Sequence, residues 1–460
     1  MTDIPYDVWE CVTSYVSDEY LKELYSLNPA FFHASMAERY RTVKLERYTN
    51  LKVIEHLRDS DISKLVRRLE FYYPWFPEAD SRIVAGILRA QLSAMSGMLA
   101  YLNDIQEIFI VWDTMEVPME FFASIWNAFG TNLKKLTIDA SLPKSIHMLA
   151  SHPTFPSLED MELAIRGGNT IQDGALNEGC LYRCFSSTIR RLKVHSYHVD
   201  PSNIFSLLPC FTDLRVLHVT VDTLCDLTCL VNLLIRHAHT LKDVALEEMT
   251  SSTQSNQWMK HFFGEHVNEH TLPLSNLQSL SLIPSRLPLD VLEVCLHRSS
   301  DTLTSLALPN NCLTYNQLEK VVTIFSRAQL LKNLHVSVFT ITPETFDLLA
   351  SKLPGLARLI LIYSNIIGLP GSAHLNTSSH LPLGQYKILR RELSKKSYPQ
   401  WKLQDIAISQ WRKGAQFGPP EWSVMTAVAK ATPSVRSLAG QGNTEIPEVY
   451  HNAYFDELGT

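Results

Sequence analysis

One short apolar pattern recurs along the chain and limits what the chain can fold into. Each copy has an aliphatic residue, two mostly polar residues, a second aliphatic residue, one variable residue and a third apolar residue. Its three anchor residues occur twelve times, as Val66/Leu69/Phe71, Ile105/Ile108/Ile110, Leu133/Leu136/Ile138, Leu158/Met161/Leu163, Ile189/Leu192/Val194, Leu214/Leu217/Val219, Leu241/Val244/Leu246, Leu277/Leu280/Leu282, Leu303/Leu306/Leu308, Leu331/Leu334/Val336, Leu356/Leu359/Leu361 and Leu403/Ile406/Ile408. Eight of the eleven steps between successive first anchors are 25 to 31 residues long, which suits one strand and one helix per copy.

The spacing of the anchors predicts how the copies stack. On a β-strand the second and third anchors point to the same face, and one copy cannot bury that face alone. Neighbouring parallel strands roughly 4.8 Å apart would form a continuous core, with helices returning along the outside. Apolar spacing predicts such helices over 121–129, 204–208 and 346–353. The alternative is an ordinary α/β protein whose parallel strands share the pattern.

The copy Leu303-xx-Leu306-x-Leu308-xx-Asn311-x-Leu313 resembles the leucine-rich-repeat superfamily. The resemblance implies that Asn311 hydrogen-bonds backbone at the bend after the strand. Most other copies lack this asparagine, so irregular repeats are expected. The predicted fold is an α/β leucine-rich-repeat solenoid, with a curved parallel sheet inside and helices outside, preceded by a small helical module.

Spacing and composition divide the chain into three parts. The helical module is expected over 1–48, the solenoid over 49–440 and a C-terminal tail over 441–460. Gly368-Leu-Pro-Gly-Ser-Ala373 is rich in turn-forming residues, so a mobile insertion is expected near 364–384, followed by a helix over 385–393. The partial copy Val435-xx-Leu438 suits a cap on the last strand.

The first forty residues do not follow the repeat. Their apolar spacing suits short helices, with Pro5 starting a helix over 6–14 and Pro29 ending or bending a second apolar stripe. The segment resembles an F-box. The resemblance rests on Ile4, Pro5, Asp7, Val8, Val12, Tyr15, Val16, Leu21, Leu24 and Leu27, with Phe31 or Phe32 as the aromatic residue. Asn28-Pro29 replaces the usual cysteine and basic residue, a departure that bears on adaptor binding.

An F-box followed by leucine-rich repeats implies a substrate-recognition subunit of an SCF-type, cullin-based E3 ubiquitin ligase. The F-box would bind a Skp-type adaptor and the repeats a protein substrate, whose identity the sequence does not give, while catalysis belongs to other subunits. The residues expected to bind the adaptor are Ile4, Pro5, Val8, Trp9, Val12, Tyr15, Val16, Leu21 and Leu24. The alternative is a protein-binding scaffold with no ligase connection, in which the N-terminal helices only cap the solenoid core.

Charged residues at exposed strand positions suggest where a substrate would bind. The candidates are Arg190, Arg191, Lys193, Arg215 and His218, which flank second anchors on two consecutive strands. Such a cluster could hold an acidic or phosphorylated peptide. The alternative is a solvated face of mixed charge.

Bulk properties narrow the partners further. The formal net charge of -6 argues against a nucleic-acid partner, and no apolar run approaches the roughly 18 residues of a membrane span. The N-terminus lacks the basic segment of a signal peptide, so a cytoplasmic or nuclear location, with no membrane partner, is expected. Eight cysteines without a C-x-x-C spacing suggest packing rather than disulfides, including the pairs Cys180/Cys184 and Cys225/Cys229.

One motif points to chemistry. His266-Val-Asn-Glu-His270 spells H-x-x-E-H, in which two histidines on a helix ligate zinc and the glutamate activates water. It lies in an insertion between repeats, Pro273 follows it, and no motif supplies a third ligand. A zinc hydrolase is therefore the third hypothesis. No other motif joins a nucleophile to a base, so neither a cofactor nor an enzymatic activity is expected.

Overall fold

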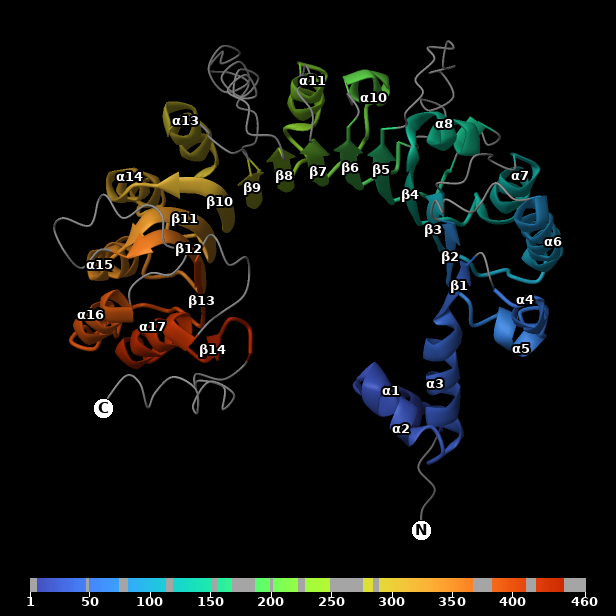
Figure 1. Ribbon diagram of the computed structural model, residues 1–460, viewed down its shortest axis with the longest axis horizontal. Helices are drawn as coiled ribbons and strands as arrows, with labels where there is room; N and C mark the ends of the chain where they lie inside the picture. Colours follow the sequence, from blue (N-terminus) through green and yellow to red (C-terminus); the bar gives the residue numbers. More distant parts are fainter. Residues whose placement is uncertain are drawn as a thin grey trace. The chain divides into compact units, whose positions relative to one another are not determined.

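The computed structural model describes residues 6–46, 49–73, 82–112, 119–150, 155–167, 187–198, 202–221, 228–248, 276–283, 289–366, 383–410 and 419–441. The chain forms two compact units, Met1–Leu214 and Arg215–Thr460. In each unit the strands run side by side and helices lie on one face of them (Figure 1).

Unit 1 contains a helical start and six described strands. Its helices are α1 (Tyr6–Thr13), α2 (Asp18–Leu24), α3 (Pro29–Arg41), α4 (Leu51–His56), α5 (Ser60–Ser63), α6 (Arg82–Leu99), α7 (Met119–Phe129), α8 (Leu142–Ala150) and α10 (Ser202–Leu207). Its strands are β1 (Thr42–Glu46), β2 (Arg68–Tyr73), β3 (Glu107–Trp112), β4 (Lys135–Ser141), β5 (Asp160–Arg166) and β6 (Arg191–Tyr197).

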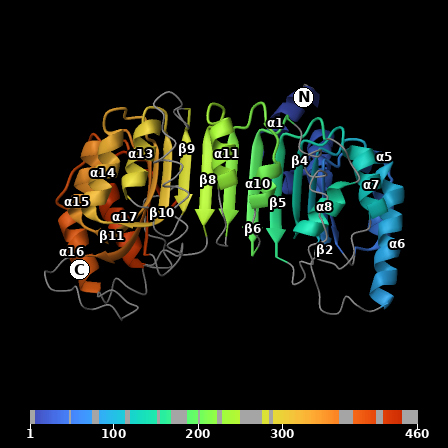
Figure 2. The same cartoon turned by 90° about the horizontal axis from the view of Figure 1, so that it is seen from above.

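Unit 2 contains eight described strands. They are β7 (Val216–Val221), β8 (Asp243–Glu248), β9 (Ser279–Ile283), β10 (Ser305–Leu313), β11 (Asn333–Ile341), β12 (Arg358–Ile366), β13 (Asp405–Gln410) and β14 (Ser437–Leu438). Its helices are α11 (Thr228–His237), α13 (Leu289–Ser299), α14 (Tyr315–Phe325), α15 (Pro343–Lys352), α16 (Leu383–Leu393) and α17 (Pro419–Ala431). Figure 2 shows α11 and α13 lying alongside the strands of this unit.

The strands of each unit are parallel and follow the order of the sequence. Their register places second anchors opposite second anchors, such as Leu136↔Met161 in unit 1 and Leu334↔Leu359 in unit 2. Every anchor of the twelve copies is at most 5% exposed. The predicted leucine-rich-repeat solenoid is therefore confirmed, with strands that stack their apolar face into a continuous core.

A repeated backbone hydrogen bond joins one copy to the next. In copies of both units, the carbonyl group that follows the first anchor accepts from two consecutive N–H groups of the next copy. Gln106 O accepts from Lys134 N at 2.8 Å and Lys135 N at 3.0 Å. Thr304 O accepts from Lys332 N at 2.8 Å and from the next N–H at 3.0 Å. This shared acceptor satisfies backbone groups that would otherwise be buried without partners.

Side chains reinforce this junction in several copies. The residue just before the first anchor carries a hydroxyl or amide that donates to a carbonyl of the preceding copy. Thr188 donates to Leu158 O, Thr302 to Leu277 O and Ser434 to Leu403 O, each at 2.8 Å. The anchors thus explain the core, and the small polar residue beside them helps to fix the copies to one another.

Helices return on one face of the strands, as predicted. Helices α7, α10 and α15 lie over the three predicted ranges, and α16 over the predicted 385–393 helix. Pro29, predicted to end or bend an apolar stripe, is instead the first residue of α3. A proline at this position loses no helical hydrogen bond, and the Asn28 side chain accepts from Phe31 N at 3.1 Å to cap the helix.

The strand β10 contains a bulge at the position of the family asparagine. Leu308 pairs with Val336 and Leu313 with Val338, so the four residues between them on β10 lie opposite one residue, Ser337. The Ser337 hydroxyl donates to the carbonyl of Pro309. Asn311 is buried within this bulge, where the resemblance predicted a bend.

Both ends of the described sheet lie next to helices. Strand β1 follows α3 directly and pairs with β2, so the parallel strands start inside the range predicted for the helical module. Strand β14 has two residues and pairs with β13, at the predicted partial copy. The predicted insertion near 364–384 lies largely outside the described residues, as does all but the first residue of the predicted tail.

A buried polar cluster joins three elements of unit 2. The Tyr363 and Tyr386 hydroxyl oxygens are 2.6 Å apart, and each hydroxyl lies 3.3 Å from Oε1 of Glu421, a residue with no exposed surface. Burial and the adjacent Tyr386 and Glu421 groups raise the pKa of Tyr363. The cluster links β12, α16 and α17 through a carboxylate that two phenols satisfy.

Candidate protein-binding surfaces

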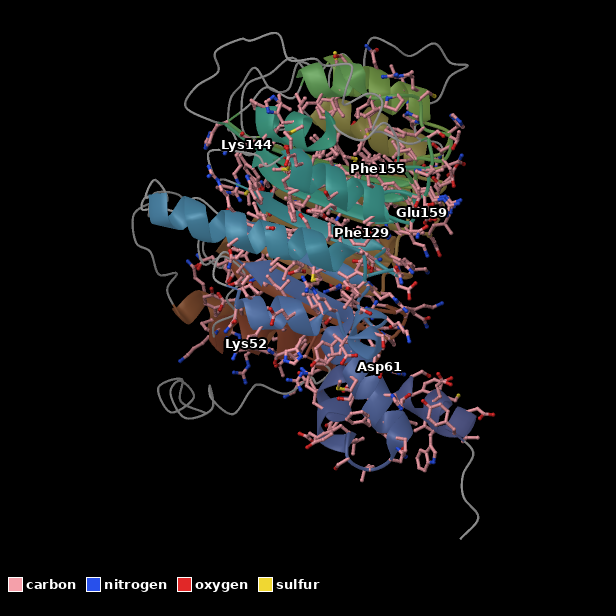
Figure 3. All side chains as sticks on the ribbon, turned by 90° about the vertical axis from the view of Figure 1, so that its right-hand side faces the viewer. Lys52, Asp61, Phe129, Lys144, Phe155 and Glu159 are labelled. Atoms are coloured by element: carbon pink, nitrogen blue, oxygen red, sulfur yellow. The ribbon has the colours of Figure 1, made fainter. Side chains whose placement is uncertain are left out.

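The N-terminal helices form a small module with a thin core. Helices α1 and α2 both pack against α3. Leu21, Ala30 and Phe31 are buried, and the Trp9 and Phe31 ring centroids are 5.8 Å apart. Figure 3 shows this module extending away from α4 and α5, where Lys52 and Asp61 are labelled. Its outer surface is therefore available to other molecules.

Large apolar side chains are concentrated on that outer surface. Within the described part of α1 to α3 the exposed ones are Tyr6, Val8, Val12, Tyr15, Tyr20, Tyr25, Leu27 and Phe32. Tyr15 is 86% exposed and Leu27 65%. Burial of apolar surface is the main source of protein association, so a concentration of this kind marks an interaction site.

The residues predicted to bind an adaptor differ in their exposure to solvent. Val8, Val12 and Tyr15 are exposed, whereas Leu21 is buried and holds the module together. The half-buried ones are Trp9, Val16 and Leu24, and Ile4 and Pro5 lie outside the described residues. Tyr20 and Tyr25 were not predicted from the sequence to bind an adaptor. Each lies next to an apolar residue of the second stripe, and each is exposed.

The strand face of unit 1 that is turned away from the helices carries a row of alternating charge. The residues just before the second anchors are Arg68, Glu107, Lys135, Asp160 and Arg191, which the register places side by side. Arg68 lies 3.5 Å from Glu107, and Asp160 lies 3.8 Å from Lys135 and 3.2 Å from Arg191. Each charge thus has an opposite charge on a neighbouring strand.

The predicted substrate-binding cations are distributed over both units. In unit 1, Arg190 pairs with Glu159 and Asp213 at 3.7 and 3.3 Å, and Lys193 pairs with Glu162 at 4.0 Å. Arg191 pairs with Asp160, as described above. In unit 2, Arg215 is exposed, and His218 lies 3.4 Å from Asp243. The structure therefore surrounds most of these cations with carboxylates, and a binding role for them stays a prediction.

On the corresponding strand face of unit 2, the row just before the second anchors includes Asp243, Arg358 and Asp405, whereas the row just after them is mostly uncharged. The row that contains His218 continues through Ala245, Ser281, Ala307, His335, Ile360 and Ala407. Burial, with the nearby Arg358, lowers the pKa of His335 and favours its neutral form at pH 7. This second row offers shape and apolar contact rather than charge.

A pocket of about 430 Å³ opens at the carboxyl ends of β10 and β11. It is lined by Thr314, Tyr315, Phe339, Thr340, Thr342, Glu344 and Thr345, so it includes the first turns of α14 and α15. Tyr315 and Phe339 are 43% and 53% exposed. The sequence analysis did not predict this pocket. The exposed aromatic residue Phe339 lies on β11 between the buried apolar residues Val338 and Ile341, and this pattern could have indicated a binding site.

Most residues of the chemical motifs found in the sequence lie outside the described residues, so these motifs stay predictions. His266–His270, Cys180, Cys184 and Cys225 lie outside the described residues, and Cys229 is half-buried on α11. The described residues contain no group of three histidine, cysteine or acidic residues placed to hold a metal ion. Among them there is also no helix whose length and apolar character would let it cross a membrane.

No protein-family model matches the chain, and no curated protein matches its sequence. Among solved structures, a chain from the crystal structure of the Rad7 and Elc1 complex in yeast is similar. The match covers 90% of this chain and 91% of that chain, with 11% sequence identity and a TM-score of 0.37.

Proposed function

We propose that this protein is a substrate-recognition subunit of an SCF-type, cullin-based E3 ubiquitin ligase. Helices α1 to α3 would bind a Skp-type adaptor, and the repeats would hold a protein substrate. Catalysis would belong to other subunits, and the protein would act in the cytoplasm or nucleus. The observation that carries this proposal is the concentration of exposed apolar residues on the N-terminal module.

The arrangement of that module supports the proposal in two ways. Val8 and Val12 both lie on α1 and are 48% and 40% exposed, so an adaptor could bury them without unfolding the module. Leu21 and Phe31 are buried, and the half-buried Trp9 packs near Phe31, so the residues needed for folding differ from the exposed Val8 and Val12. An interaction surface on a separately packed module is what an adaptor requires.

A pull-down of the full chain with a purified Skp-type adaptor tests the proposal. We expect Val8→Glu and Val12→Glu to weaken binding at least tenfold, because a carboxylate cannot enter an apolar interface without losing its hydration. Ile235→Glu, at an exposed position on α11, is the matched control and should bind like the wild type. Circular dichroism checks that each variant folds.

A second candidate is a protein-binding scaffold without a ligase partner. It is favoured by the continuity of α3 with β1, because helices in that position also shield the first described strand of the sheet. A folded wild-type chain that fails to bind any Skp-type adaptor would support the scaffold and contradict the ligase proposal.

A further inference from the structure

The pocket at the carboxyl ends of β10 and β11 combines aromatic rings with one carboxylate. Tyr315 and Phe339 supply the rings, and Glu344 is the only charged residue among the described residues that line it. Four threonines, Thr314, Thr340, Thr342 and Thr345, add hydroxyl groups to the wall. Rings attract cations through their negative faces, and a carboxylate attracts them through its charge.

The surroundings of the pocket are electronegative. Burial and the charges of Glu319, Glu344 and Asp347 raise the pKa of Tyr315. Asp347 already binds the Lys396 ammonium at 2.6 Å and the Tyr398 hydroxyl at 2.8 Å. Glu344 is exposed on the pocket wall, so its carboxylate can receive a cation from solution.

An anionic ligand fits this pocket less well. Helix N-termini bind anions through free N–H groups, but several N–H groups at the starts of α14 and α15 already have partners within the chain. Thr314 N donates to Gln317 Oε1 at 2.8 Å, and Gln317 N donates to Thr314 Oγ1 at 3.4 Å. Thr342 N donates to Thr345 Oγ1 at 3.3 Å. The remaining charge in the wall is negative.

We propose that this pocket binds a lysine or arginine side chain of the partner protein held by the repeats. The cation would lie against the Tyr315 and Phe339 rings, pair with Glu344 and donate to the threonine hydroxyls. Both rings are exposed, so a side chain that projects from a larger ligand can reach them. This inference rests on the proposed role of the repeats in substrate binding and names the chemistry of the bound segment.

Peptide selection on the full chain tests the proposal. A phage-displayed library of random dodecapeptides is panned against the wild-type chain and depleted on the Phe339→Ala/Glu344→Gln double variant. We expect enriched peptides to share a lysine or arginine at one position. Replacing it with norleucine or citrulline, which keeps length but removes charge, should weaken binding at least tenfold by calorimetry.

Single variants assign the effect to the pocket. Glu344→Gln should weaken the selected peptide about tenfold. Glu120→Gln should leave its affinity within twofold, because Glu120 is also an exposed acid in the first turn of a helix but lies on α7. Enriched peptides without a basic residue, enrichment of phosphoserine-mimicking acidic peptides, or no enrichment over the double variant would each overturn the proposal.

The outcome is separable from the adaptor experiment. The double variant should still bind the Skp-type adaptor as the wild type does, because its changes lie in unit 2 and the adaptor residues in α1 to α3 of unit 1. If the wild type binds basic peptides but no adaptor, the pocket assignment stands and the ligase proposal fails. If the wild type binds the adaptor but selects no basic peptides, the ligase proposal stands and the pocket assignment fails.

Discussion

The strand faces of the two units follow the same register but carry different chemistry. In unit 1 the residues before the second anchors alternate in sign, from Arg68 to Arg191. In unit 2 the same row holds three uncharged residues in succession, Ser279, Ser305 and Asn333, between the charged Asp243 on one side and Arg358 and Asp405 on the other. The buried half of each strand is dictated by stacking, whereas the outward half is free to differ, so binding specificity is expected to reside in the outward half.

The largest expected effect concerns the buried apolar anchors, which both units share. Leu136→Ala in unit 1 and Leu334→Ala in unit 2 remove anchors that are at most 1% exposed. Each should reduce the free energy of unfolding by about 2–5 kcal/mol, because it removes buried apolar contact and leaves a cavity. Urea unfolding measures this. A loss below 1 kcal/mol in only one unit would show that the two cores are not equivalent.

The next largest effect concerns the buried polar cluster of unit 2. Glu421→Ala removes the carboxylate acceptor shared by Tyr363 and Tyr386 and should cost about 1–3 kcal/mol of unfolding free energy, since the two buried hydroxyls then share only one hydrogen bond between them. Glu319→Ala, at an exposed position on α14, is the control and should change stability by less than about 0.5 kcal/mol. Equal losses in both variants would contradict the role of the cluster.

Acid should destabilise unit 2 through His237. Burial, with Arg236 and His239 nearby, lowers the pKa of this 1% exposed histidine to about 4. The unfolded chain takes up a proton near its ordinary pKa of about 6.5, so stability is lost as pH falls from about 6.5 towards 4. Between pH 7 and pH 5.5 the loss should be about 1 kcal/mol. His237→Gln should show a smaller loss in urea titrations at the two pH values.

The smallest effect sharpens the contrast between the strand faces. Asp160→Asn removes the charge that pairs with Lys135 and Arg191 and should cost about 1 kcal/mol at low salt and less at 0.5 M NaCl. Ser305→Ala, in the corresponding row of unit 2, should change stability by less than about 0.5 kcal/mol at either salt concentration. Salt dependence in both variants would mean that the faces do not differ electrostatically.

Much of the fold could be predicted from the sequence, because the three anchors set strand, face and order at once. The strand β1 was missed. It has two of the anchors, Val43 and Leu45, but the position of the first anchor is occupied by Tyr40, which lies in α3. The repeat pattern begins with an aliphatic anchor, and Tyr40 is an aromatic residue within a helix, so this segment does not match the pattern.

The candidate sites were less predictable. Apolar spacing indicated that Val8, Leu21 and Leu24 belong to one module, but only packing separates the exposed Val8 from the buried Leu21. Likewise, the cations from Arg190 to Lys193 were readable, whereas their carboxylate partners depend on register across strands. The pocket at the carboxyl ends of β10 and β11 is formed by the ends of two strands, close to the bulge in β10. No single copy of the repeat contains all of these parts.

The shared carbonyl after the first anchor has a consequence for how such a chain can change length. Gln278 O accepts from Thr304 N, and Thr304 O accepts from Lys332 N, so these successive copies end with the same acceptor and begin with the same donors. Excising one whole copy, such as 304–331, would bring Lys332 N to Gln278 O and leave no broken junction. The protein can therefore gain or lose whole copies by recombination, while insertion of a partial copy would leave an acceptor without its donors.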